Sequence, residues 1–374
     1  RKELGSRESS LILAVAEERF SMHRAQLLCV AGVTVGAYRL SSASLILPAR
    51  TWPARSWPIH AASSGEVDLD AWLTLGGGVE TADIITALSS GYKDVASQVR
   101  SASCDSTACF NDFRNEQLAI DLLAEEILLE KLSECGRPVI VSTLWDQAMT
   151  PLGGEDSEYA IVVNPLDGSS WIDTNFAVGS LFGVWRARSV LNVTGRELVA
   201  AGACTYGPRT TLSLALATRP GVTEFLLVED RASQHDRWVR TNLYESLSEG
   251  RLFAPANLRA VVAHQGFAEL VKYWQDNRYQ LRYSGGIVLD VMQLLVKGRG
   301  VFVNPAISGA RPSPRLLYEA IPLAYLIEKG GGISSDGSQS LLDIEVRAVD
   351  QRTQVAFGSA EEVRRFDEMV GVAS

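Results

Sequence analysis

Cysteine and histidine are scarce in this chain, which has five cysteines and four histidines among 374 residues. Five cysteines are too few for a disulfide-stabilised scaffold, and no cluster of cysteine and histidine has the spacing of a zinc site. Excess positive charge is also lacking, because the formal net charge is -9, which argues against broad nucleic-acid binding. Small anionic ligands remain compatible with this charge, since a few local cations can bind a phosphate on an acidic protein.

Acidic residues are absent from one long stretch near the N-terminus, between Arg19 and Gly65. Within it, residues 25–38 form an apolar run that is too short for a membrane span and fits the hydrophobic part of a signal peptide. Residues 41–64 are rich in Ser, Ala and Arg, as in an organelle transit peptide. We expect residues 1–75 to be a targeting presequence, with those before Met22 translated from upstream. The alternative is a buried N-terminal helix.

The rest of the chain lacks internal repeats, low-complexity tracts and long linkers, and its composition of 46% hydrophobic and 21% charged residues is that of a globular protein. Hydrophobic periodicity predicts helices and strands in alternation. We therefore expect an α/β fold in which sheets and helices are layered. The predicted helices are 116–132, 267–275, 289–296, 316–329 and 360–369, and the predicted strands are 159–163, 180–185, 211–217 and 224–228.

The sharpest local signal is the loop at residues 164–170, which follows the first predicted strand. A carboxylate such as that of Asp167, at the end of a buried strand, can hold a divalent cation, and the Leu166 carbonyl can add a second oxygen. The N–H groups of Gly168, Ser169 and Ser170 can then bind a phosphate. Mg²⁺ suits this arrangement because it takes few carboxylates, together with water and phosphate oxygens. The alternative is a plain Asp-Gly turn capped by serine.

Five motifs occur in order along the chain: NPLDGSSWIDTNFAVGSLFGVW at 164–185, YGPRTT at 206–211, LRYSGG at 281–286, RLLYE at 315–319 and DQRTQV at 350–355. Together they resemble the fructose-1,6-/sedoheptulose-1,7-bisphosphatase family, and the resemblance runs from about residue 97 to residue 369. Segments 102–109, 173–185 and 206–211 are similar to its sedoheptulose branch. The resemblance implies a sugar-phosphatase fold with alternating layers of helices and sheets. It also implies a phosphatase domain at 76–250 and a sugar-phosphate-binding domain at 251–374.

The resemblance implies a role for each matching residue. Asp167, the Leu166 carbonyl and Glu319 match ligands of Mg²⁺, with Asn164 at a further ligand position. Asp121 matches the carboxylate that helps to activate the attacking water, Glu116 lies near it, and Arg315 matches a cation beside the reacting phosphate. The reacting phosphate would bind to Gly168, Ser169 and Ser170, and the distant phosphate to Asn257, Arg282 and Tyr283.

Cys104 and Cys109 match the regulatory cysteine pair that thioredoxin reduces in the plastid enzyme. The resemblance therefore implies a reversible disulfide, and spacing alone is equally compatible with two ordinary thiols. It further implies a sugar bisphosphate as substrate, a homo-oligomer (dimer or tetramer), and a mature protein in the chloroplast or plastid stroma with no membrane or nucleic-acid partner.

The chain departs from the family pattern around the metal ligands. Asn164 replaces the first Asp of Asp-Pro-Leu-Asp, Thr143 and Leu144 replace two metal-bridging glutamates, and Asn115 replaces an acid. Ser313 stands in place of a phosphate-binding lysine. Of five expected acidic ligands only Asp167 and Glu319 are left, and the nearby acids that could substitute are Asp146, Glu155 and Asp156.

Two main hypotheses follow. The first is a Mg²⁺-dependent bisphosphatase that hydrolyses the 1-phosphate of a sedoheptulose or fructose bisphosphate. The second is a non-catalytic relative that kept the fold and binds sugar phosphate or a partner protein. An enzyme similar to inositol monophosphatase would share the Asp-Gly-Ser loop but lack the C-terminal motifs.

Overall fold

The computed structural model describes residues 67–75, 80–101, 119–153, 156–229, 236–307, 309, 312 and 314–371. Ala62–Ser374 form one compact unit. Most of the predicted presequence, together with Glu116, Cys104 and Cys109, lies outside the described residues. Within the described part, no helix has the length and hydrophobicity needed to cross a membrane.

The first sheet has eight strands in the order β2-β1-β3-β4-β5-β6-β7-β8. Only β1 and β3 pair in parallel, and every other neighbouring pair is antiparallel. β3 is buried along almost its entire length, as its apolar sequence YAIVVNPL predicts. The strands are β1 (Val139–Thr143), β2 (Thr150–Leu152), β3 (Tyr159–Asp167), β4 (Val178–Trp185), β5 (Leu198–Tyr206), β6 (Thr210–Leu216), β7 (Val222–Val228) and β8 (Arg237–Tyr244).

The second sheet has five strands in the order β10-β9-β11-β13-β12. They are β9 (Ser248–Pro255), β10 (Gln280–Leu281), β11 (Arg299–Asn304), β12 (Ile333–Ser335) and β13 (Val355–Gly358). The chain passes from one sheet to the other between Tyr244 and Ser248. This change lies a few residues before the predicted domain boundary at 250/251.

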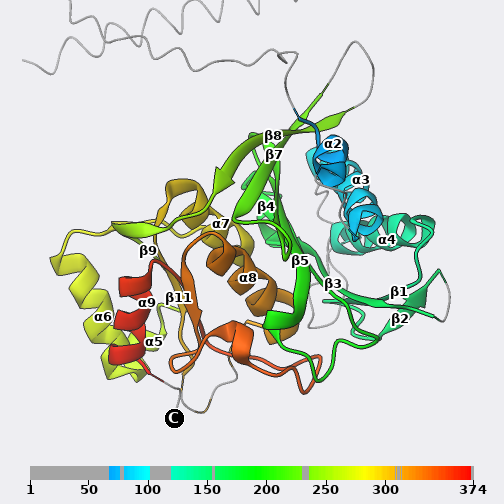
Figure 1. The fold of residues 1–374 in the computed structure, drawn as a ribbon. Coiled ribbons are helices and arrows are strands. Elements are labelled where there is room, and N and C mark those ends of the chain that lie inside the picture. The colour runs from blue at the N-terminus through cyan, green and yellow to red at the C-terminus, as the bar shows by residue number, and fades with distance from the viewer. Residues whose placement is uncertain are drawn as a thin grey trace, which may run out of the picture. The chain divides into compact units, whose positions relative to one another are not determined.

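Helices and sheets alternate in five layers (Figure 1). Of the helices in the described part of the chain, two fill the space between the sheets, three cover the outer face of the first sheet and three cover the outer face of the second. Side chains point alternately to the two faces of β3, and both faces are buried. Ala160 and Val162 face the central helices, while Ile161 and Val163 face the outer ones. The outer helices on the first sheet are α2 (Leu69–Thr74), α3 (Ala82–Ser101) and α4 (Ala119–Glu134). The central helices are α7 (Ile287–Lys297) and α8 (Ile321–Lys329). The outer helices on the second sheet are α5 (Ala260–Ala263), α6 (Gln265–Asp276) and α9 (Ala360–Met369). The predicted layered α/β fold is confirmed.

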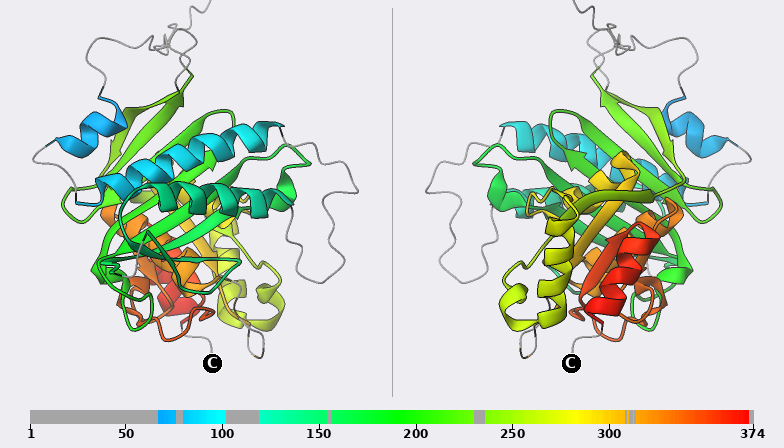
Figure 2. Two further views of the ribbon diagram at one scale, coloured as in Figure 1. Left: turned by 90° about the vertical axis from the view of Figure 1, so that its right-hand side faces the viewer. Right: turned by 90° about the vertical axis from the view of Figure 1, so that its left-hand side faces the viewer.

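α3 and α4 run side by side over the first sheet (Figure 2). Their close approach requires a glycine, because a Cβ atom at Gly91 would lie 2.7 Å from the Leu128 side chain. The shorter α2 belongs to the same layer, since Leu69, Trp72 and Leu73 are buried in its core. The folded part therefore begins before the predicted end of the presequence at residue 75.

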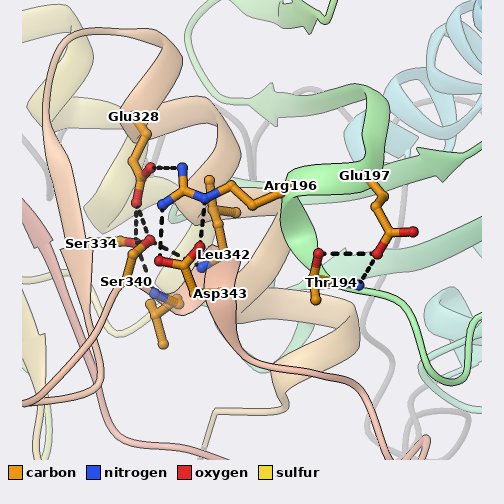
Figure 3. A network of polar contacts seen from close by, with 9 residues as sticks. Thr194, Arg196, Glu197, Glu328, Ser334, Ser340, Leu342 and Asp343 are labelled. Atoms are coloured by element: carbon orange, nitrogen blue, oxygen red, sulfur yellow. Dashed lines mark hydrogen bonds and ion pairs between the residues drawn. The ribbon is translucent and has the colours of Figure 1, made fainter.

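Arg196 links two separate turns to a helix (Figure 3). Its guanidinium donates to Glu328 of α8 at 2.7 Å, and to both carboxylate oxygens of Asp343 at 2.8 and 3.2 Å. The hydrogen bond with Arg196 is the largest cause of the lowered pKa of Asp343. Glu328 also accepts from the Ser334 hydroxyl at 2.7 Å. The network joins the 3₁₀ turns Gly195–Glu197 and Leu341–Asp343 to the central helix α8.

Replacing Arg196 should therefore destabilise the fold. We expect Arg196→Gln to lower the free energy of unfolding by about 1–2 kcal/mol, because it removes charge-assisted bonds to a largely buried glutamate. Arg347→Gln is the matched control, since the Arg347 side chain pairs with the nearby Glu345 and is 78% exposed. It should cost less than about 0.5 kcal/mol. Urea unfolding of the three proteins measures the difference, and equal losses in both variants would contradict this assignment.

Candidate active site

Asp167 ends β3 at a point where the regular strand pairing is interrupted. The register of β3 against β4 shifts between Asn164 and Asp167, so that Pro165 and Leu166 lie outside the ladder. Pro165 is held there because its carbonyl accepts the Ser180 hydroxyl at 2.6 Å. Such bulges redirect side chains and backbone groups next to functional sites. Here the bulge places the Leu166 carbonyl and the Asp167 carboxylate immediately before the glycine-serine loop.

Gly168 allows the chain to turn at this point. Its φ of +81° lies in the left-handed region, and it precedes the 3₁₀ turn Ser169–Trp171. The N–H groups at the start of such a turn have no partner within it and can bind an anion. Asp167 is fixed from the other side, because its Oδ2 accepts the Val288 N–H in the first turn of α7 at 2.9 Å. A Cβ atom at Gly286 would lie 3.2 Å from the same oxygen.

Negative charge accumulates around Asp167. Burial, which is the largest cause, and the charges of Glu319, Asp290 and Asp121 together raise the pKa of Asp167 to about 7, against the hydrogen bond from Val288. Burial also raises the pKa of Glu319. A cation beside such a carboxylate favours its ionised form. The arrangement is therefore chemically suited to a divalent cation and to a phosphate ester bound beside it.

Glu319 is presented by an irregular helix. Leu316–Ala320 form a π-helical turn that leads directly into α8, so the predicted helix at 316–329 has two parts. π-helical turns are frequent at functional sites. Glu319 Oε2 accepts the Arg315 N–H at 2.7 Å, and the Arg315 guanidinium donates to the Leu144 carbonyl at 2.8 Å. Arg315 thus joins the Glu319 turn to the end of β1.

The start of α4 turns carboxylates toward the protein interior and two leucines toward solvent. Asp121 is fully buried and its Oδ2 accepts the Ser169 hydroxyl at 2.9 Å, whereas Leu122 and Leu123 are 40% and 36% exposed. Glu125, one turn further along, is 7% exposed and accepts the Thr143 hydroxyl. Burial of acids in place of leucines marks this helix as part of a site. Glu125 was missed by the sequence reasoning, although its i+4 spacing from Asp121 was a usable signal.

Thr143 and Leu144, which stand where the family pattern has two glutamates, make hydrogen-bond and packing contacts within the fold. Thr143 is buried, and its hydroxyl bonds to Glu125 and to the backbone of Asp146. Leu144 packs in the central core. Asp146, a suggested substitute, is exposed, and its carboxylate accepts the N–H of Ala148 at 3.1 Å. Its charge is not among those that raise the pKa of Asp167. Asp156 is also exposed, and Glu155 lies outside the described residues.

Asn164 is 1% exposed, and neither atom of its amide group has a hydrogen-bond partner among the described residues. A buried amide of this kind carries a desolvation cost unless it finds a partner. Its oxygen could act as a neutral ligand together with Asp167, Glu319 and the Leu166 carbonyl. Within the described part of the chain, however, no three Asp, Glu, His or Cys side chains gather closely enough to hold a metal. The residues therefore fit a single cation that takes further ligands from water and phosphate, and not a cluster built on acids alone.

A second pocket of about 500 Å³ opens beside the ends of β9 and β11. Asn257 has a φ of +50° and its amide donates to the Pro305 carbonyl at 3.0 Å, which fixes one wall. Tyr283 lines the pocket, while Arg282 is exposed and is not among the lining residues. The described lining residues are Ala256, Asn257, Leu258, Arg259, Tyr283, Asn304, Pro305, Ala306, Ile307 and Pro312.

The chain from Tyr283 to Gly286 connects this second pocket to Asp167. Burial raises the pKa of the Tyr283 phenol, and the charges of Asp290 and Asp167 raise it further. Asp290 is buried and accepts the N–H groups of Ser284 and Gly285 at 2.8 and 3.0 Å, so it holds the connecting loop. Asp290 was also missed, although it is the one acid within an otherwise apolar predicted helix.

Two family models match most of the chain. The model for the fructose-1-6-bisphosphatase N-terminal domain matches residues 75–234, and the one for the C-terminal domain matches residues 247–371. The chain belongs to the fructose-1,6-bisphosphatase family. Within this family, the chloroplastic sedoheptulose-1,7-bisphosphatase of Spinacia oleracea is 43% identical over 285 residues, which cover 76% of this chain and 72% of the relative.

Other members of the fructose-1,6-bisphosphatase family are similar over the same part of the chain. The class 1 fructose-1,6-bisphosphatase of Geobacter metallireducens is 34% identical over 292 residues, 77% of this chain and 90% of the relative. A crystal structure from Toxoplasma gondii, described as a sedoheptulose-1,7 bisphosphatase, has a TM-score of 0.73 and 32% identity, and the match covers 81% of this chain and 98% of that one. Sequence and structure therefore agree on the family.

The raised pKa of Asp167 gives a prediction for the metal-free protein. Because the folded-state pKa of about 7 exceeds the ordinary value of 3.8, the folded protein keeps a proton that the unfolded chain has lost between these values. The Asp167 contribution to stability therefore falls as pH rises from about 4 through 7. With EDTA present, Asp167→Asn should gain stability relative to the wild type between pH 5 and pH 8. Asp173→Asn, an exposed control in the same loop, should follow the wild type. Parallel curves for Asp167→Asn and the wild type, measured by thermal unfolding, would contradict the prediction.

Proposed function

We propose that this protein is a Mg²⁺-dependent sugar bisphosphatase that hydrolyses the 1-phosphate of sedoheptulose-1,7-bisphosphate or fructose-1,6-bisphosphate. The observation that carries the proposal is the position of Asp167 directly before the glycine-serine loop, where Ser169 bonds to Asp121 and the charges of Asp121 and Glu319 act on the Asp167 carboxyl. Family membership supports the same chemistry. The greater identity with the Spinacia enzyme, 43% against 34% for the Geobacter one, favours the sedoheptulose substrate.

Each side chain has a distinct part in such a reaction. The N–H groups of Gly168, Ser169 and Ser170 would bind the reacting phosphate, and Asp121 would orient a water molecule next to it and accept its proton. Arg315 would place positive charge near the phosphate oxygens. A Mg²⁺ ion held by Asp167, Glu319, the Leu166 carbonyl and the Asn164 amide oxygen would supply charge neutralisation of the phosphate.

The setting of the reaction is part of the same proposal. The chloroplastic relatives and the predicted presequence support a plastid protein of photosynthetic carbon fixation. We also propose that thioredoxin reduces a disulfide between Cys104 and Cys109, and that the protein forms a homo-oligomer. Reduction should increase the number of free thiols by two in the wild type, and by none in the Cys104→Ser variant. Cys204 does not substitute, since it is fully buried and its pKa is raised by burial.

A second candidate function is supported by Thr143 and Leu144. Leu144 lies in the core where the family pattern has a metal-bridging glutamate, and Thr143 bonds to Glu125. A protein without that pair of charges could bind a sugar bisphosphate and fail to hydrolyse it. The two candidates differ in a single observable, the release of phosphate.

Phosphate release from both bisphosphates by the reduced protein should appear as Mg²⁺ is raised. Asp167→Asn should reduce this release at least about hundredfold, because it removes a charged ligand that also binds the start of α7. The exposed Asp173→Asn should retain wild-type release. If the wild type binds a bisphosphate in calorimetry but releases no phosphate at any Mg²⁺ concentration, the enzyme proposal is wrong and the binding-protein candidate replaces it.

Restoring a carboxylate at Asn164 should strengthen cation binding. We expect Asn164→Asp to lower the half-saturating Mg²⁺ concentration at least about tenfold, which corresponds to about 1.4 kcal/mol, because a charged ligand replaces a buried neutral amide. Asn192→Asp adds the same charge at an exposed loop position and serves as the control. A Mg²⁺ requirement that stays the same in Asn164→Asp, or moves equally in both variants, would show that Asn164 is not a ligand.

A further inference from the structure

A chain of hydrogen bonds between buried hydroxyl groups ends at the bulge formed by Pro165 and Leu166. Ser180 of β4 is fully buried, and its hydroxyl donates to the Pro165 carbonyl at 2.6 Å. The Tyr206 phenol, at the end of β5, lies 2.8 Å from the same hydroxyl and belongs to a residue that is 4% exposed. Both residues lie in motifs of the sequence, at 164–185 and 206–211, and no role was predicted for either.

The chemistry of the two hydroxyl groups sets the direction of this chain. A serine hydroxyl has one proton to donate, and Ser180 gives it to the Pro165 carbonyl. The Tyr206 phenol is therefore the donor to Ser180. Burial raises the pKa of the Tyr206 phenol well above its usual value, so the phenol keeps the proton that this bond requires. Hydrogen bonds aligned in one direction strengthen one another, and here they converge on a single carbonyl.

The position of Pro165 depends on this carbonyl. Pro165 is buried, has no N–H group and lies outside the ladder between β3 and β4, so its carbonyl is the backbone group through which it can be held. The peptide group that joins Pro165 to Leu166 is planar, and fixing its oxygen fixes the start of Leu166. The proposed cation ligands of this segment, Asn164, Leu166 and Asp167, lie on both sides of Pro165. Ser180 therefore anchors the middle of the segment that carries them.

The neighbouring residue of β4 supports the same segment from the other face of the sheet. Gly179 pairs with Asp167, and a Cβ atom at Gly179 would lie 2.7 Å from the Val288 side chain. α7 thus packs directly on this point of β4, and from there the Val288 N–H reaches the Asp167 carboxylate. Successive residues of a strand face opposite sides of the sheet. The segment is therefore held by Ser180 on one face and by the start of α7 on the other.

We propose that Ser180 and Tyr206 are positioning residues of the cation site. Their hydrogen-bond chain fixes the Pro165 carbonyl and thereby holds the Leu166 carbonyl and the Asn164 amide in the orientation that a divalent cation requires. Groups that orient metal ligands from behind contribute to metal affinity without touching the metal. The presence of the cation rests on the proposed function.

Binding of Mn²⁺ to the full-length protein, followed by the electron paramagnetic resonance signal of free Mn²⁺, tests this role without any requirement for turnover. Ser180→Ala should weaken Mn²⁺ binding about tenfold to hundredfold, because this is the usual effect of removing a group that orients a metal ligand. Tyr206→Phe should weaken it less, since Ser180 still donates to Pro165. Ser180→Thr keeps the hydroxyl and should bind Mn²⁺ as tightly as the wild type.

Ser335→Ala is the matched control, because it removes a buried hydroxyl from the second sheet. Ser335 of β12 is 2% exposed, and its hydroxyl donates to Asp367 and accepts the Gly337 N–H. This variant should lose stability, as Ser180→Ala does, and leave Mn²⁺ binding unchanged. All variants are titrated at a temperature at which circular dichroism shows them to be folded. Cation affinity therefore separates positioning from a general loss of stability.

Equal Mn²⁺ affinity of Ser180→Ala and the wild type would overturn the proposal, as would an equal loss in Ser180→Ala and Ser335→Ala or a wild type that binds no Mn²⁺. If Ser180→Ala does not fold, unchanged binding in Tyr206→Phe overturns it and weaker binding supports it. Weaker Mn²⁺ binding in Ser180→Ala, in a protein that releases no phosphate, would support the positioning role while removing the proposed enzymatic function. Phosphate release by the wild type with unaltered Mn²⁺ binding in the variant would do the reverse.

Discussion

The burial of the Asp167 carboxyl beside other acids is the constraint on which the rest of the site depends. Burial and the charges of Glu319, Asp290 and Asp121 together raise the pKa of Asp167 to about 7. Folding therefore places Asp167 where its ionised form is disfavoured, and it can do so because the two large sheets and their helices supply the stabilisation elsewhere. A divalent cation would stabilise the ionised carboxylate, which makes cation binding and substrate binding parts of one electrostatic arrangement.

Each carboxylate reaches this point from a different layer of the fold. Asp121 comes from an outer helix, Asp167 from the end of a central strand, and Glu319 from the turn that begins the central helix α8. Hydrogen bonds fix their positions: Ser169 donates to Asp121, Val288 to Asp167 and the Arg315 backbone to Glu319. The second pocket is attached to the same centre through the loop at residues 283–286.

Much of the fold could be predicted from periodicity, because α6, α7 and α9 and the strands β3, β4, β6 and β7 have strong apolar patterns. β5 was missed since its sequence, LVAAGACTY, is rich in alanine and glycine, which have weak strand preference. The proposed metal ligands Asp167 and Glu319 were predicted from motifs. Glu125 and Asp290 were not, because their burial depends on which side of an element faces the site. That orientation is decided by tertiary packing, as the exposed Leu122 and Leu123 beside buried Asp121 demonstrate.

The central claim is that the carboxylates remaining around Asp167 hold one divalent cation next to the phosphate-binding loop. Anomalous diffraction from crystals grown with Mn²⁺ and a sugar bisphosphate tests it most directly, since Mn²⁺ prefers the same oxygen ligands as Mg²⁺. The account predicts a single strong peak within about 2.5 Å of oxygens of Asp167, Glu319 and the Leu166 carbonyl. No peak at this position, or one centred on Asp146 or Glu125 instead, would contradict it.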